Sequence, residues 1–175
     1  MALNDVGGLP EELVFARSTY CVEVAQAVAH NRDMISIFNP GGSGKVIKVL
    51  KAWAVVPSSS GATVVIPFEL RRATAVGAGT VQVETPLDSI NAAAAAVVRV
   101  LPTSITDATQ AVFWTWIEQI NTAQGGTENM SHTLHDAGGA ALRQPLTLRP
   151  SEGLYLRQIA SNTSTFRMGF LWTEE

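Results

Sequence analysis

The sequence of 175 residues has little cysteine and little charge. Cys21 is the only cysteine, so no disulfide can form within the chain, and we interpret it as a small buried hydrophobe. Charged residues make up 15% of the chain and leave a net charge of −3, which argues against a broad basic surface for nucleic acid. The low charge indicates instead that other subunits cover part of the surface.

Long apolar runs are also missing. No run approaches the roughly 18 residues of a membrane-spanning helix, and the first residues lack the basic-then-apolar profile of a secretory signal. We therefore expect no membrane partner, and we interpret the glycosylation patterns at Asn129 and Asn162 as chance matches. With 46% apolar residues, the chain has enough material for the core of one domain.

Short apolar runs separated by turn residues dominate the chain from residue 18 onward. Residues 1–17 show no sustained periodicity, so we interpret them as a loose arm before a single domain, 18–175. Alternation or β-branched content predicts strands at 18–28, 34–38, 63–76, 81–84, 146–148, 153–160 and 165–172. About eight to ten short strands predict an all-β fold, an antiparallel β-sandwich of jelly-roll type.

Three segments are ambiguous. Residues 45–56 place apolar side chains on a helical stripe, but four valines and an isoleucine favour a strand. Residues 90–101 begin with alanines and end in β-branched residues, as in a short helix or loop that leads into a strand. The aromatic segment 111–120 fits either element, and we favour a strand. Residues 121–141, rich in glycine, threonine and asparagine, are predicted to form the longest loop.

Two local features add detail to this prediction. Pro67 cannot donate a hydrogen bond within a sheet, so it predicts an edge strand or a bulge. The stretch NPGGSGKV, 39–46, looks at first like a phosphate-binding loop. That loop needs a glycine where Asn39 stands and a hydroxyl for magnesium where Val46 stands, so we reject it. We predict a hairpin bend with positive φ angles, after which Lys45 opens the next strand.

The histidines are weak candidates for a metal site. His132 and His135 lie three residues apart, but they share a face only in a helix, and the sequence identifies no third ligand. We favour loop histidines that bind nothing, and His30 has no visible partner. No nucleophile elbow and no spaced pair of acids occurs, so we predict no enzyme, no catalytic residue and no cofactor.

Two further groups of residues have structural interpretations. Glu69, Arg71 and Arg72 lie on one predicted strand, which favours a cross-strand ion pair. The four tryptophans could stack on sugars, but in a small β-sandwich we favour positions in the core or an interface. They are Trp53, Trp114, Trp116 and Trp172.

The order of five motifs resembles that of a group of small bacteriophage virion proteins. The motifs are IFNPGGSGKVIKV, FELRRATAVGAGT, ETPLDSINAAAAAVVRV, LTLRPSEGLYL and FRMGFLWTEE, and together they extend over residues 34–175. In LTLRPSEGLYL, read as a hairpin, Ser151 stands where a glycine would be more usual. The motifs are turn and packing signatures without catalytic content.

The resemblance implies a structural role in a virion, assembled in the host cytoplasm. It points to a decoration (cement) protein that binds the major capsid protein or other virion proteins, in a family often assembled as trimers. The alternative is a fibre or baseplate tip module that binds a host receptor or glycan. We expect contacts from residues 1–17 and from the 121–141 loop. The candidate residues there are Leu13, Val14, Phe15, Arg17, Asn129, His132 and His135.

Overall fold

A computed structural model describes residues 17–29, 32–55, 64–121, 126–127, 131–133, 146–159 and 164–175. Every regular element in these ranges is a strand, and none of the described residues forms a helix. The strands are β1 (Ser18–Val28), β2 (Asp33–Asn39), β3 (Ile47–Val55), β4 (Val64–Ala75), β5 (Thr80–Gln82), β6 (Thr85–Pro86), β7 (Val97–Val100), β8 (Thr106–Asn121), β9 (Gly126–Thr127), β10 (Ser131–Thr133), β11 (Leu146–Leu148), β12 (Glu152–Gln158) and β13 (Ser164–Glu174).

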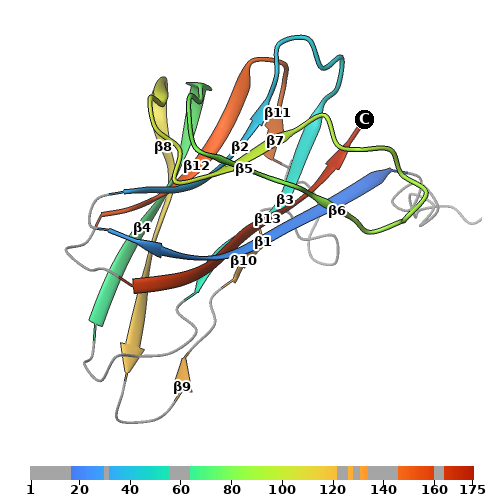
Figure 1. The fold of residues 1–175 in the computed structure, drawn as a ribbon. Coiled ribbons are helices and arrows are strands. Elements are labelled where there is room, and N and C mark those ends of the chain that lie inside the picture. Colours follow the sequence, from blue (N-terminus) through green and yellow to red (C-terminus); the bar gives the residue numbers. More distant parts are fainter. Residues whose placement is uncertain are drawn as a thin grey trace, which may run out of the picture.

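The strands form two antiparallel sheets that pack against each other (Figure 1). Sheet A has the order β10-β3-β13-β1-β6, and β11 also pairs with β3. Sheet B has the order β5-β7-β2-β12-β4-β8-β9. The predicted all-β antiparallel sandwich is therefore confirmed. Strands that follow one another in sequence often lie in different sheets, as β1, β2, β3 and β4 do.

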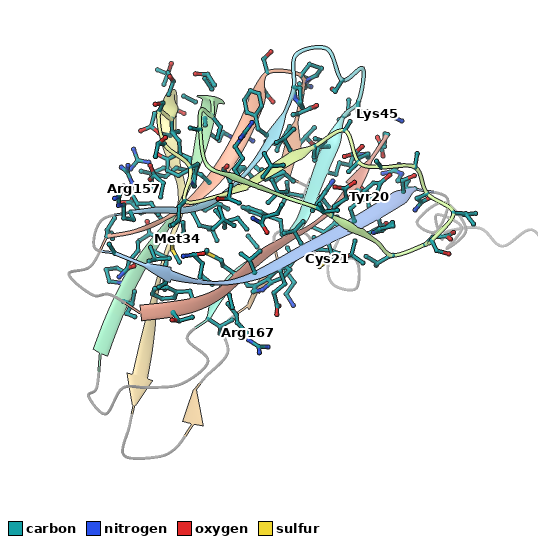
Figure 2. All side chains as sticks on the ribbon, in the orientation of Figure 1. Tyr20, Cys21, Met34, Lys45, Arg157 and Arg167 are labelled. Atoms are coloured by element: carbon teal, nitrogen blue, oxygen red, sulfur yellow. The ribbon has the colours of Figure 1, made fainter. Side chains whose placement is uncertain are left out.

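The core lies between the two sheets and consists of the side chains on one face of each strand. In β1, Tyr20 and Val22 point into it, as the predicted alternation requires. In Figure 2, Met34 lies between the layers, whereas Arg157 and Arg167 point outward from different sheets. The largest fully buried side chains include Trp172, Phe68, Phe166, Phe170, Ile35, Ile37, Ile47 and Leu70.

A β-bulge interrupts the alternation of β3. Across the β13–β3 pair, Leu171 lies opposite Lys51 and Trp172 opposite Val49, which leaves Leu50 unpaired. One extra residue reverses which positions face the core. The core positions of β3 therefore follow two registers, Ile47 and Val49 before the bulge and Ala52 and Ala54 after it. The favoured strand is confirmed.

The alanine tract is a loop that leads into β7, one of the two predicted possibilities. Its backbone N–H groups donate to carboxylates that are distant in sequence or in the preceding segment. Ala94 donates to Glu84 at 2.8 Å, and Ala95 and Ala96 each donate to Glu174 at 2.9 Å. Small side chains let the backbone approach these carboxylates closely, so the tract is fixed without becoming a helix.

The glycine-rich stretch 39–46 is not a hairpin, which corrects the prediction. β2 belongs to sheet B and β3 to sheet A, so this connection crosses from one sheet to the other. The N–H of Ser43 donates to the carbonyl of Pro40 at 3.1 Å, which closes a turn. Gly44 has a φ of 65°, as predicted for a glycine turn, and β3 begins two residues after Lys45.

Asn39 fixes this crossing with its buried side chain. Its Nδ2 donates to the carbonyls of Lys45 and Leu148, at 2.9 and 3.0 Å. Its Oδ1 accepts from the hydroxyl of Ser43 at 2.5 Å. Asn39, which stands where a phosphate-binding loop needs a glycine, thus joins the turn to β11.

The connection from β11 to β12 also crosses between the sheets, so LTLRPSEGLYL is not a hairpin. The N–H of Glu152 donates to the carbonyl of Arg149 at 3.0 Å, and Pro150 and Ser151 occupy the centre of the turn. Ser151 has a φ of 68°, so the turn is of type II. This backbone conformation favours glycine, the more usual residue at this position of the motif.

Two more predictions need correction. Pro67 predicted an edge strand or a bulge, but β4 lies between β12 and β8, and its register irregularities lie beyond Leu70 and not at Pro67. Pro67 is accommodated because β12 ends beside Phe68, and the Pro67 carbonyl accepts only from Ile159, just beyond the strand. In a strand, the nitrogen and the carbonyl oxygen of one residue point toward the same neighbouring strand. The nitrogen of Pro67, which has no hydrogen to donate, therefore points past the end of β12.

Residues 121–141 are not one uninterrupted loop, because they contain β9 and β10.

Candidate interaction site

The segment between β5 and β7 carries the most exposed large apolar side chains of the described residues. Val83 is 87% exposed, Leu87 62% and Ile90 86%. The segment includes β6 and follows the edge of sheet A beside β1 (Figure 1). We call residues 83–93 the projecting segment.

Hydrogen bonds fasten the projecting segment to β1. The N–H of Leu87 donates to the carbonyl of Thr19 at 2.8 Å. The hydroxyl of Tyr20 donates to the carbonyl of Ala92, also at 2.8 Å. The exposed apolar side chains therefore stand on a fixed backbone. A soluble protein rarely leaves such a group uncovered, so this segment is a candidate contact surface for a protein partner.

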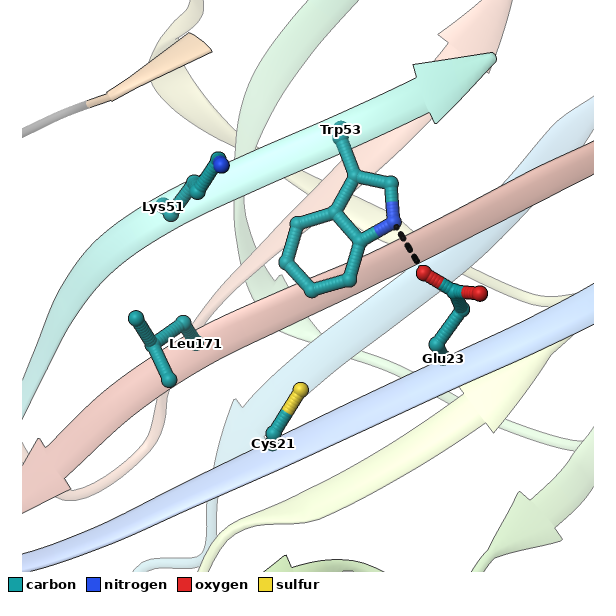
Figure 3. A pocket seen from close by; sticks show the side chains of 5 residues that line it. All are labelled: Cys21, Glu23, Lys51, Trp53 and Leu171. Carbon is teal, nitrogen blue, oxygen red and sulfur yellow. Dashed lines mark hydrogen bonds between the residues drawn. The ribbon is translucent and has the colours of Figure 1, made fainter. Parts of the chain in front are cut away.

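A second surface feature is a shallow pocket on the outer face of sheet A. It has a volume of about 350 Å³ and is formed by side chains from β1, β3 and β13. Figure 3 shows the lining residues, which are Cys21, Glu23, Lys51, Trp53 and Leu171. We call it the tryptophan pocket. Its apolar lining beside two opposite charges suits a ligand or partner with both apolar and polar groups.

Trp53 is held in one position at this pocket. Its indole Nε1 donates to a carboxylate oxygen of Glu23 at 3.2 Å (Figure 3). Lys51 Nζ lies 5.9 Å from the ring centroid, within range of a cation–π interaction. The ring lies over Gly169, which is directly opposite in β13. Trp53 is buried, yet it lies outside the core, whereas Trp172 is a core residue as predicted.

Cys21 lines this pocket and is only partly buried, so its predicted burial is incomplete. Burial raises the pKa of its thiol above the ordinary value, the carboxylate of Glu23 adds to this, and Lys51 opposes it. The thiol therefore stays protonated at neutral pH, where it is a weak nucleophile. Cys21 acts here as a small apolar wall of the pocket.

The outer face of sheet B carries a tyrosine between two arginines. Tyr155 is 1% exposed although it lies outside the core cluster. The guanidinium carbons of Arg71 and Arg157 lie 5.9 and 5.7 Å from its ring centroid, and its hydroxyl donates to Asp107 at 2.5 Å. The arginines thus cover the ring and keep it from solvent.

Carboxylates neutralise both arginines. Arg71 pairs with Glu69 on its own strand at 2.7 Å and with Asp107 on β8 at 2.5 Å, which confirms the predicted cross-strand pair for this residue. Arg157 pairs with Asp33 at 2.7 Å. Every arginine of the cluster therefore has a carboxylate partner, and the cluster has a structural role.

This cluster shifts the pKa values of its members. Burial would raise the pKa of Asp107, but hydrogen bonds from Tyr155 and Arg71 outweigh it and lower that pKa below the ordinary value. Burial raises the pKa of Tyr155, and its hydrogen bond to Asp107 raises it further. At neutral pH the tyrosine is a donor and the aspartate an acceptor.

Few of the contact residues predicted from sequence lie in the described ranges. Arg17 is exposed and pairs with Glu175, next to the start of β1. His132 lies in β10 and pairs with Ala52 along the backbone. The described residues hold no group of three or more potential metal ligands. The remaining predicted residues, Leu13, Val14, Phe15, Asn129 and His135, lie outside the described residues, as does His30.

The projecting segment was not among the contact regions predicted from sequence. Leu87 and Ile90 carry a signal, because they stand among turn-forming residues without the alternation of a buried strand. Val83 was placed in the strand predicted at 81–84, but β5 ends at Gln82. The tryptophan pocket has no local signal, since it depends on β1, β3 and β13 lying side by side.

No protein-family model matches the sequence, and no curated protein or solved structure is significantly similar to it. No helix long and apolar enough to cross a membrane occurs in the described part of the chain.

Proposed function

We propose that this protein is a structural component of a bacteriophage virion, namely a decoration (cement) protein that binds and stabilises the assembled capsid. The observation that carries the proposal is the projecting segment, whose exposed apolar side chains on a fixed backbone offer a surface to a protein neighbour. The virion as its setting is supported by the resemblance of the five motifs along residues 34–175. Its location is then the virion, assembled in the host cytoplasm.

The mechanism is selective binding to the assembled lattice. A protein that binds the finished shell and not its separate subunits stabilises the shell by mass action. Association of three copies adds avidity, because one trimer contacts several capsid subunits at once. The partners are the major capsid protein or other virion proteins. Residues 1–17 and 121–141 remain the proposed contacts, and the projecting segment joins them.

We also propose that the sandwich is of the jelly-roll type. The strand order supports this, because sheet B contains the run β2-β12-β4-β8. Sheet A contains the run β3-β13-β1, and the two short strands β10 and β11 both pair with β3. These runs supply four strands a sheet when β10 and β11 count as one, as a double-sheet jelly roll has.

The receptor-binding alternative would use exposed aromatic side chains. Trp53 and Trp172 are 8% and 0% exposed, so neither offers a ring face for stacking on a sugar. Among the tryptophans whose side chains the structure describes, burial thus favours the decoration role over a tip module; the side chains of Trp114 and Trp116 are outside that description.

The test mixes the purified protein with mature capsids of its presumed phage and, separately, with host cells. We expect saturable binding to capsids and greater capsid resistance to heat. A protein that ignores capsids and coats host cells would instead be a tip module. Binding to neither would remove the virion proposal altogether.

A further inference from the structure

We propose that the projecting segment of one copy docks into the tryptophan pocket of a second copy, and that three such head-to-tail contacts close a trimer. This inference deepens the proposed function and rests on the self-association included in it. It names the two surfaces that meet and the residues that make the contact.

The apolar groups of the two surfaces are complementary. Leu87 and Ile90 project from a fixed backbone, and the pocket offers Trp53 and Leu171 as its apolar walls. A cavity of about 150 Å³ holds a benzene molecule, so the pocket of about 350 Å³ has room for an aliphatic side chain. Docking removes apolar surface from water on both sides.

One pair of charges beside these groups is also complementary, while the acidic lining residue Glu23 already has partners in Trp53 and Arg167. Asp88 stands between Leu87 and Ile90 and is exposed, and its Oδ1 accepts only a short-range bond from the N–H of Ile90 at 3.1 Å. Lys51 borders the pocket. None of the ion pairs of the described residues includes either Asp88 or Lys51. A docked copy would bring the two opposite charges together at the rim of the contact.

One copy cannot fill its own pocket. The projecting segment is tied to the outer edge of β1 at Thr19 and Tyr20, whereas Trp53 lies on β3, beyond β13. The two surfaces differ, and one lies at the sheet edge while the other lies on the sheet face (Figures 1 and 3). A contact between two different surfaces is heterologous, and such contacts form closed rings when the rotation between copies allows it.

The first test measures the mass of the protein in solution. We expect the wild type to have the mass of three copies and Ile90→Asp that of one, because a charge in the apolar pocket weakens the contact about tenfold or more. Thr109→Asp is the matched control, since Thr109 is exposed on β8, far along sheet B from β5. It should keep the mass of the wild type. A wild type that is monomeric at all concentrations would overturn the inference.

Cys21 reports whether the pocket itself is covered. Because it is the only cysteine, a thiol reagent at pH 8.5 modifies this one lining residue. We expect slow modification in the wild-type trimer and about tenfold faster modification in Ile90→Asp and in diluted wild type. Equal rates in the trimer and the monomeric variant would show that the copies meet elsewhere, and would overturn the inference.

A mixing experiment tests whether the segment of one copy meets the pocket of another, and the mass of three copies in the wild type separates a ring from a two-fold dimer. Lys51→Glu damages only the pocket and Ile90→Asp only the projecting segment. A mixture of the two variants retains one intact contact and should form a complex of two copies. Absence of that complex would contradict the heterologous arrangement. Capsid binding is a separate measurement, so a protein that forms this trimer but ignores capsids would disprove the virion role alone.

Discussion

Gly169 lies directly opposite Trp53, and the indole ring occupies the space into which a side chain at residue 169 would point. A Cβ there would overlap the ring atom Cζ2 of Trp53 and the backbone carbonyl oxygen of Val22. The carbonyl belongs to β1 and cannot move aside without breaking its pairing with β13.

The first prediction is that Gly169→Ala destabilises the protein strongly. Overpacking at a site with no room costs roughly 3 kcal/mol in the free energy of unfolding, which urea denaturation measures. Gly42→Ala is the control, because a Cβ at Gly42 meets nothing within 4 Å. If both variants lose equally little stability, the close packing of Trp53 on Gly169 is wrong.

The second prediction concerns the two tyrosines that donate hydrogen bonds. Tyr155→Phe removes a bond to the carboxylate of Asp107, whereas Tyr20→Phe removes a bond to the neutral carbonyl of Ala92. Bonds to charged groups contribute about 1.5–3 kcal/mol and neutral ones about 1 kcal/mol. Urea denaturation should therefore show the larger loss for Tyr155→Phe. The reverse order would contradict the structural role of the tyrosine–arginine cluster.

The third prediction is a loss of stability in acid. The pKa of Asp107 is lower in the folded state than in the unfolded chain, so the unfolded chain binds the proton first as the pH falls. The contribution is complete above the ordinary aspartate pKa of about 3.9 and disappears as the pH falls through the folded value. The stability difference between wild type and Asp107→Asn should be largest near neutral pH and shrink below about pH 4.

Denaturation midpoints from pH 7 to pH 2 test this prediction. Glu175 contributes in the same direction, because its hydrogen bond from Lys48 lowers its pKa. The wild type should therefore keep some acid sensitivity after Asp107 is replaced. A constant difference between wild type and Asp107→Asn over the whole pH range would contradict the lowered pKa of Asp107.

The fourth prediction concerns the carboxylate that holds the alanine tract. Glu174→Gln replaces one acceptor oxygen by an NH₂ group. This donor would then face another donor, the backbone N–H of Ala95 or Ala96. We expect a loss of about 2–3 kcal/mol, the cost of leaving a buried polar group unsatisfied.

The adjacent residue supplies a matched control for this variant. Glu175→Gln breaks surface ion pairs with Arg17 and Lys48, and exposed pairs contribute about 0–1 kcal/mol. Thermal denaturation should separate the two variants clearly. Equal effects would mean that the carboxylate of Glu174 does not anchor the loop.

The strands were predictable where one register extends over the whole element. In β1, the inward positions Tyr20 and Val22 alternate with outward ones, and the predicted bounds are those observed. In β3, the bulge at Leu50 reverses the alternation. The apolar pattern of residues 45–56 therefore did not fit a strand of one register, and it left both helix and strand open. Short-range periodicity identifies a strand only until an extra residue is inserted.

The partners of each strand were less predictable than the strands. The turn at 39–46 has the glycines of a hairpin, but its sequence does not specify whether the next strand joins the same sheet. The crossing is held by a contact distant in sequence, from the amide of Asn39 to the carbonyl of Leu148. The tryptophan pocket was missed for the same reason, because Cys21 and Trp53 are 32 positions apart in the chain numbering and meet only through β13.

The place of β13 in the sheet has a consequence for protein synthesis. It pairs with β1 on one side and with β3 on the other, although it follows every other described strand in sequence. Until β13 has been translated, the edges of β1 and β3 that it pairs with expose unpaired backbone N–H and C=O groups. The sandwich therefore closes only after translation has passed Trp172, and a product cut short before this residue is left for chaperones and proteases.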